Sequence, residues 1–80
     1  MLFRYNDQMI TEDDFLQLDE NDQEKALENW LKDNYEEDQL NGNDIRDILD
    51  AEVSTYSSEK VRENVSQNHE GIRYRKKDNA

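Results

Sequence analysis

Apolar residues recur along the chain in short groups, and their spacing predicts the order of the elements. In LFRYNDQMIT, two runs of strand-forming residues flank Asn6 and Asp7, which tolerate the backbone conformations of a two-residue turn, so a β-hairpin is expected. Thr11 then has the position of a helix N-cap, with Asp14 three residues later, which predicts a short helix from about Glu12 to Leu18. The hairpin is therefore expected to lead directly into a helix.

The second predicted helix follows Asp19, another N-cap residue, and has the clearest helical period in the chain. Leu27, Trp30 and Leu31 fall on one face of it. We expect Trp30 to lie in the core. Tyr35 leaves this apolar face at the end of the helix, and since tyrosine is a common anchor of interfaces, it is the better candidate for an exposed contact with a partner.

A turn around Gly42 and a third helix are expected next. In EEDQLNGN, Leu40 is the one residue expected to be tucked into the protein. Asn43 is a suitable cap for the third helix. The apolar stripe of that helix consists of Ile45, Ile48, Leu49, Val53 and Tyr56.

The C-terminal third is less clearly patterned. A fourth helix is expected from Glu59 to about Asn68, but its stripe is only Val61 and Val65, so it is expected to need contact with a partner to form. The segment GIRYRKKDNA alternates apolar and basic residues. This pattern fits a strand that joins the N-terminal hairpin, and it equally fits a disordered basic tail.

These elements predict a mainly α fold with a small β element (α+β): an N-terminal β-hairpin followed by three or four short helices. Residues 1–68 are expected to form one small helical domain, and residues 69–80 a basic tail. A chain of 80 residues hides only about 60% of its unfolded surface, so a single modest core is expected.

Charge adds the strongest constraint on function. The net charge is −11, and Asn6 to Glu59 holds eighteen acidic residues against three basic ones, a local net of −15. Lys60 to Ala80 holds six basic residues against three acidic ones. Binding to nucleic acid or to an anionic membrane begins with cationic contacts to phosphate, so neither is expected, and a basic partner is the natural complement.

Cysteine and targeting signals are absent from the sequence. Without cysteine there is neither a disulfide framework nor a thiolate metal site, which fits a reducing compartment. No apolar run approaches the ~20 residues that cross a bilayer, and MLFRYNDQMI is too polar for a signal peptide. A complete, soluble, cytoplasmic chain is expected.

Catalytic and cofactor motifs are also missing. His69, the one histidine, lies in the polar segment SQNHEG and is expected to be a surface residue. Gly42 and Gly71 are too few for a phosphate-binding loop. If Gly42 is aligned with the glycine of an EF-hand loop, Ile48 takes the closing carboxylate position, so that match fails. No enzymatic activity, cofactor or metal site is expected.

Two acidic clusters can imitate phosphate charge. Carboxylates three or four apart on a helix lie about 5–6 Å apart at their Cβ atoms, comparable with the spacing of neighbouring phosphates. The candidate partner-binding residues are Tyr35 and six carboxylates: Glu36, Glu37, Asp38, Asp44, Asp47 and Asp50. The second cluster is Glu12, Asp13, Asp14, Asp19, Glu20 and Asp22. The alternative is that these residues cap helices and solvate the surface, although solubility asks for a net charge of only about 2–8 in magnitude.

Glu52 is unusual because it lies inside the apolar stripe of the third helix. It is four residues from both Ile48 and Tyr56. Two arrangements avoid an unpaired buried charge: the carboxylate sits at the edge of the stripe in water, or it pairs with Arg4, Lys60 or an arginine of the tail.

In general character, the acidic, cysteine-free first half, with segments such as ITEDDFLQLDENDQEKALENWL, resembles the small accessory proteins of bacteriophages and mobile elements. The expected function is therefore a non-catalytic acidic protein that binds a basic site on another macromolecule. In its sharper form, the protein inhibits a nucleic-acid-binding protein by acting as a DNA mimic. The alternative is a structural or regulatory adaptor that self-associates as a homodimer.

Overall fold

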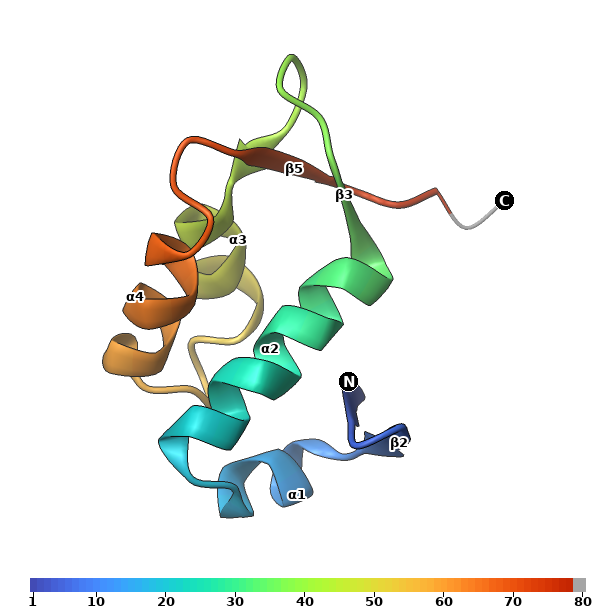
Figure 1. The fold of residues 1–80 in the computed structure, drawn as a ribbon, viewed down its shortest axis with the longest axis vertical. Helices are drawn as coiled ribbons and strands as arrows, with labels where there is room; N and C mark the ends of the chain where they lie inside the picture. Colours follow the sequence, from blue (N-terminus) through green and yellow to red (C-terminus); the bar gives the residue numbers. More distant parts are fainter. Residues whose placement is uncertain (79–80) are drawn as a thin grey trace.

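The computed structural model describes residues 1–78, and within them the elements follow the order β1–β2–α1–α2–β3–β4–α3–α4–β5 (Figure 1). The long helix α2 crosses the middle of the molecule, with α1 beside its first residues, the hairpin alongside it and a small sheet at its other end (Figure 1). The predicted fold class, an N-terminal hairpin followed by short helices, is confirmed.

The hairpin forms as predicted. Strands β1 (Phe3–Tyr5) and β2 (Gln8–Ile10) pair antiparallel. Asn6 and Asp7 have φ values of 50° and 61°, and two consecutive positive values are the signature of the turn that matches the twist of a two-residue hairpin.

The first two helices begin at the predicted caps. Helix α1 (Glu12–Gln17) begins after Thr11, whose hydroxyl accepts the Asp14 N–H. Helix α2 (Glu20–Asn34) begins after Asp19, whose carboxylate accepts the Asp22 N–H at 2.9 Å. Local capping chemistry thus sets both starting points.

A second sheet was not predicted from the sequence. It contains β3 (Tyr35–Glu37), β4 (Asn43–Asp44) and β5 (Arg73–Lys76) in the order β3–β5–β4, with both pairings antiparallel. Part of the predicted tail is therefore a strand, Arg73–Lys76, but the prediction that it joins the N-terminal hairpin is wrong; residues 79–80 lie outside the described residues. Gly42 lets the chain turn beside β5, because a Cβ there would lie 2.3 Å from the Asp38 carbonyl oxygen and 2.7 Å from the Tyr74 nitrogen.

Two details around the turn differ from expectation. Helix α3 (Ile45–Glu52) is capped by Asp44, whose carboxylate accepts the Arg46 N–H at 2.8 Å, whereas Asn43 belongs to β4. Leu40 is 91% exposed rather than tucked in. The Asp38 carboxylate accepts the N–H groups of both Leu40 and Asn41, and this tight turn leaves the leucine side chain outside the core.

Helix α4 (Glu59–Gln67) packs inside the same fold, so the expectation that it needs a partner is wrong. Ser58 caps it, and both Val61 and Val65 are fully buried. Its neighbours are α2 and α3. Two valines are enough here because both lie against elements that are already apolar.

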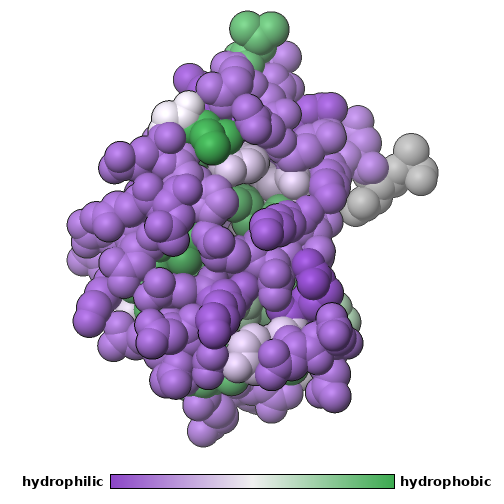
Figure 2. Space-filling view, viewed as in Figure 1, coloured by the Kyte–Doolittle hydropathy of each residue, from purple (hydrophilic) through white to green (hydrophobic). Residues whose placement is uncertain are grey.

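The core contains buried residues of every element except β2, β4 and β5, and the partly buried Ile10 of β2 and Tyr74 of β5 pack against it. The buried apolar residues are Phe3, Phe15, Ala26, Leu27, Trp30, Leu31, Tyr35, Ile45, Ile48, Leu49, Val53, Val61 and Val65. The rings of Phe3 and Phe15 stack with centroids 4.4 Å apart, and Tyr56 meets Phe3 edge-on. Figure 2 shows that the surface on this face is almost entirely hydrophilic, with apolar residues visible only in small separate patches.

Candidate functional site

The six predicted partner-binding carboxylates surround the β3–β5–β4 sheet and α3, but three of them are held by arginines of the same chain. Arg75 on β5 lies 2.7 Å from Glu36 and 3.2 Å from Asp38. Asp50 lies 3.1 Å from Arg46 and 2.9 Å from Arg62. These ion pairs neutralise part of the surface that the sequence assigns to a partner.

Four other carboxylates in this region are exposed and have no ion-pair partner within residues 1–78. We call them the open carboxylates; they are Glu37, Asp44, Asp47 and Glu52. Asp44 caps the start of α3 with its carboxylate, and Asp47 lies three residues later, in the first turn of that helix. Asp47 and Glu52 line one cavity of about 240 Å³ beside β4.

The basic tail acts as an internal counter-charge. Strand β5 brings Arg73 and Arg75 between two acidic strands. The Arg73 guanidinium donates to the Gly42 carbonyl oxygen at 2.7 Å, and its backbone N–H donates to Gln39 Oε1 at 2.7 Å. The opposite sign of the tail is thus accounted for by contacts within the chain.

Asp38 is built into the turn rather than presented to a partner. The backbone N–H groups of Asn41 and Leu40, together with Arg75, hold the pKa of this carboxyl below its usual range. Hydrogen bonds to the charged form of a carboxyl have this effect because they are weakened by protonation. Asp38 is therefore a structural residue of the acidic turn.

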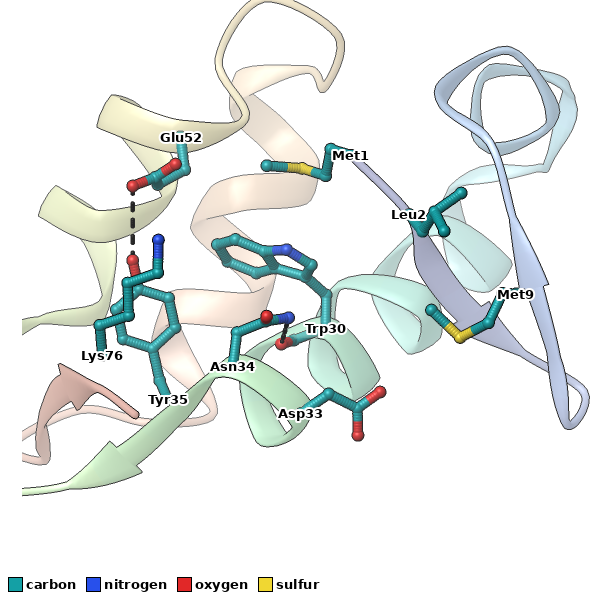
Figure 3. A pocket seen from close by; sticks show the side chains of 9 residues that line it. All are labelled: Met1, Leu2, Met9, Trp30, Asp33, Asn34, Tyr35, Glu52 and Lys76. Carbon is teal, nitrogen blue, oxygen red and sulfur yellow. Dashed lines mark hydrogen bonds between the residues drawn. The ribbon is translucent and has the colours of Figure 1, made fainter. Parts of the chain in front are cut away.

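A groove of about 380 Å³ lies between the hairpin, α2 and α3 (Figure 3). Its lining residues are Met1, Leu2, Met9, Trp30, Asp33, Asn34, Tyr35, Glu52 and Lys76. The side chains of Met1, Leu2 and Met9 are 44%, 51% and 56% exposed, whereas Trp30 is only 5% exposed, so its indole lies at the bottom of the groove. No local pattern in the sequence indicates this groove.

Tyr35 lies in this groove and not on the outer surface, so its prediction as an exposed contact is wrong. Only 9% of it is exposed, and its ring packs on Trp30 with centroids 5.5 Å apart. The Tyr35 hydroxyl donates to Glu52 Oε1 at 3.4 Å. Burial, followed by the charge of Glu52, raises the pKa of the Tyr35 hydroxyl.

Glu52 adopts the first of its two predicted arrangements, with an exposed carboxylate at the edge of the stripe. The candidate bases have other partners: Arg4 bonds Asp33 through two nitrogens, at 2.9 and 3.0 Å, and Lys60 lies 3.5 Å from Glu20. Glu52 is therefore open to the solvent between the groove and the smaller cavity, both of which it lines.

His69 is not the isolated surface residue that the sequence predicts. Its side chain is 15% exposed, and its Nε2 lies 2.5 Å from Glu28 Oε1 while its Nδ1 lies 2.8 Å from the Tyr74 hydroxyl. All three groups are satisfied when Nε2–H donates to Glu28 and Nδ1 accepts from Tyr74. Glu28 is distant in sequence, so no local pattern points to this contact.

The order carboxylate, imidazole, hydroxyl also occurs in nucleophilic enzymes, where the hydroxyl is activated. Here burial, together with the charges of Glu37 and Glu28, raises the pKa of Tyr74. A raised pKa opposes formation of the nucleophilic anion. We therefore interpret the cluster as a link between α2 and β5.

Within the described part of the chain, no group of three or more histidine, cysteine, aspartate or glutamate residues is arranged to hold a metal ion. Nor is any helix among residues 1–78 long and apolar enough to cross a membrane. No protein-family model, curated protein or solved structure matches this sequence or fold.

Proposed function

We propose that the protein is a non-catalytic binding protein that docks its acidic surface onto a basic site of another macromolecule. In the finer form of the proposal, the partner is a nucleic-acid-binding protein, and the carboxylates occupy the groove that otherwise holds phosphates. The observation that carries this proposal is the set of exposed open carboxylates on a body with a local net charge of −15.

The contacts within the chain decide which carboxylates are available. Glu36, Asp38 and Asp50 already have arginine partners, so a partner's base would have to compete with those pairs. The open carboxylates face no such competition. The residues that contact the partner are therefore the open carboxylates, Glu37, Asp44, Asp47 and Glu52. The ion pairs of Arg75 with Glu36 and Asp38, and those of Asp50, stabilise the fold instead.

Salt gives the proposal a distinctive signature. Exposed charges separated by more than about 8–10 Å are largely screened at physiological ionic strength, and attraction between an acidic and a basic surface weakens as salt increases. Duplex DNA should compete for the same basic site on the partner.

The test is capture of a partner on the immobilised protein, followed by competition with duplex DNA. The site variant replaces the open carboxylates by Gln or Asn (Glu37→Gln, Asp44→Asn, Asp47→Asn, Glu52→Gln), and Asn at position 44 preserves the helix cap. The control variant removes equal charge outside both acidic clusters: Asp7→Asn, Glu63→Gln, Glu70→Gln and Asp78→Asn, all at exposed positions. We expect the site variant to bind at least about tenfold more weakly than the control.

Equal weakening in both variants would mean that charge acts without a defined site. Capture that is indifferent to salt and to DNA would contradict phosphate mimicry.

The second candidate function, a self-associating adaptor, is favoured by the exposed side chains of Met1, Leu2 and Met9 around one groove. Two copies that each carry −11 repel each other, so a homodimer should become stronger as salt screens the charge. Sedimentation at low and high salt separates the candidates, because a monomer in both conditions contradicts the adaptor.

A further inference from the structure

We propose that the groove beside Trp30 binds a large apolar side chain of the basic partner, which is thus recognised as an apolar anchor flanked by lysine or arginine. This inference rests on the proposed function, which supplies the basic partner. It adds an apolar contact to the electrostatic contacts by which that partner is recognised. The occupant is a segment of another protein, not a nucleic acid or a lipid.

The shape and lining of the groove fit such an anchor. Its volume of about 380 Å³ lies within the range of roughly 300–1,000 Å³ that is typical of ligand pockets. Within residues 1–78, the exposed large apolar side chains are Met1, Leu2, Met9, Leu16 and Leu40, and three of these line this one groove. Methionine is flexible and polarizable, so two methionines at the rim can adapt to different apolar side chains.

An unused hydrogen-bond donor lies at the bottom of the groove. The Trp30 indole N–H donates to no acceptor within the described residues, and yet no buried side-chain nitrogen among them lacks a partner. The nitrogen must therefore be accessible, although the residue as a whole is only 5% exposed. A bound segment can supply the acceptor, for example a backbone carbonyl oxygen.

Charge selects the class of occupant. Glu52 lies on the α3 side of the groove (Figure 3). Asp47 lines the adjoining cavity, which shares Tyr35, Glu52 and Lys76 with the groove. Asp33, on the opposite side, is held by Arg4, so the α3 side is where a partner's bases are best placed. Lys76 lines both cavities, and Asp47 and Glu52 are the open carboxylates that offset its charge there. A second copy with a net charge of −11, or an anionic membrane, is the poorer complement.

Trp30 is the one tryptophan of the chain and therefore reports directly on the groove. The probe is a synthetic peptide of lysine and arginine around a central leucine pair, without tryptophan or tyrosine. A matched peptide has serine in place of leucine, and a third has glutamine in place of the bases. Only the first peptide is expected to shift Trp30 emission to the blue and protect it from acrylamide quenching.

The matched variants locate the contact. Leu2→Gln with Met9→Gln removes two of the three exposed apolar side chains of the rim without changing the charge, and the affinity for the first peptide is expected to fall about tenfold or more. The control, Leu16→Gln with Leu40→Gln, removes two exposed apolar residues outside the groove and should leave the affinity unchanged. All four positions are exposed, so both variants are expected to fold, which circular dichroism checks.

Equal binding of the leucine and serine peptides, or equal affinities of the two variants, would overturn the inference. A dimer that is lost in Leu2→Gln with Met9→Gln would also overturn it, because a second copy would then fill the groove. The proposed function can fail independently, because it depends on the open carboxylates and not on the groove. If partner capture is lost in the open-carboxylate variant but kept in Leu2→Gln with Met9→Gln, only the inference about the groove is contradicted.

Discussion

Substitution of Phe3 tests whether the hairpin is part of the hydrophobic core or folds separately from it. It is fully buried on β1, stacks on Phe15 of α1 and meets Tyr56 edge-on with ring centroids 6.0 Å apart. One ring therefore joins β1, α1 and the segment after α3. We expect Phe3→Ala to destabilise the whole fold and not just the hairpin.

The expected loss is large compared with the total stability. Truncation of a buried phenylalanine to alanine costs about 3–5 kcal/mol, which includes the cavity left behind. For 80 residues, the free energy of unfolding is about 4–12 kcal/mol, at roughly 0.05–0.15 kcal/mol per residue. Phe3→Ala should therefore remove about a quarter or more of the stability. Phe3→Leu keeps most of the volume and should cost about 1–2 kcal/mol.

Urea denaturation measures both values, followed by Trp30 fluorescence and by circular dichroism. With a slope of about 1 kcal/mol per molar urea for a small protein, the midpoint of Phe3→Ala should fall by about 3 M or more. Met9→Ala, on the same hairpin but 56% exposed, is the control and should stay within about 0.5 kcal/mol of the unmodified protein. If Phe3→Ala costs less than about 1 kcal/mol, the hairpin does not belong to the core and the reasoning is wrong.

Two further predictions concern charge and the link to the sheet. Arg4 holds the pKa of the Asp33 carboxyl below its usual range, so the unfolded chain binds a proton at Asp33 more readily than the folded chain does. The stability that this ion pair adds is therefore present above about pH 4 and is lost as the pH falls below that value. Asp33→Asn should therefore flatten the loss of stability in acid, measured as the urea midpoint against pH, whereas Asp13→Asn should not. His69→Ala removes the bridge between α2 and β5 and should cost about 1–2 kcal/mol in the same assay, and an equal effect of the exposed control Asn68→Ala would contradict that role.

The hairpin and the helix starts were predictable because their signals are local. Thr11 and Asp19 cap helices through residues three positions away, and Asn6 and Asp7 supply the turn by themselves. The apolar stripe of α4, which contains Val61, looks too small to hold the helix in place. That α4 forms without a partner could therefore be seen only from its tertiary contacts.

The second sheet was not predictable in the same way. Strand β4 has two residues, and the register of β3 pairs Tyr35 with Lys76, far away in sequence. Tyr35 seemed to leave the apolar face because the helical period was continued through it. The chain becomes extended at Tyr35, with φ −130° and ψ 153°, and this turns the ring onto Trp30.

In the candidate site, too, local features were predictable from the sequence and contacts between distant segments were not. The sequence places the acidic residues in one region, but which of them are neutralised depends on the register of β5, which brings Arg75 to Glu36 and Asp38. The groove depends on the fold, which brings Met9 and Trp30 to the lining of one cavity, and no local spacing encodes that arrangement.

The position of β5 between β3 and β4 has a consequence for the order in which the structure forms and opens. The two acidic strands are close in sequence, yet each pairs with β5 and not with the other. Because such distant segments must close a long loop before they pair, the sheet should assemble after the hairpin and the helices. In hydrogen exchange, β3 and β4 should lose protection together whenever β5 leaves, as a single cooperative unit. The basic end of the described chain thus determines when the acidic turn becomes ordered.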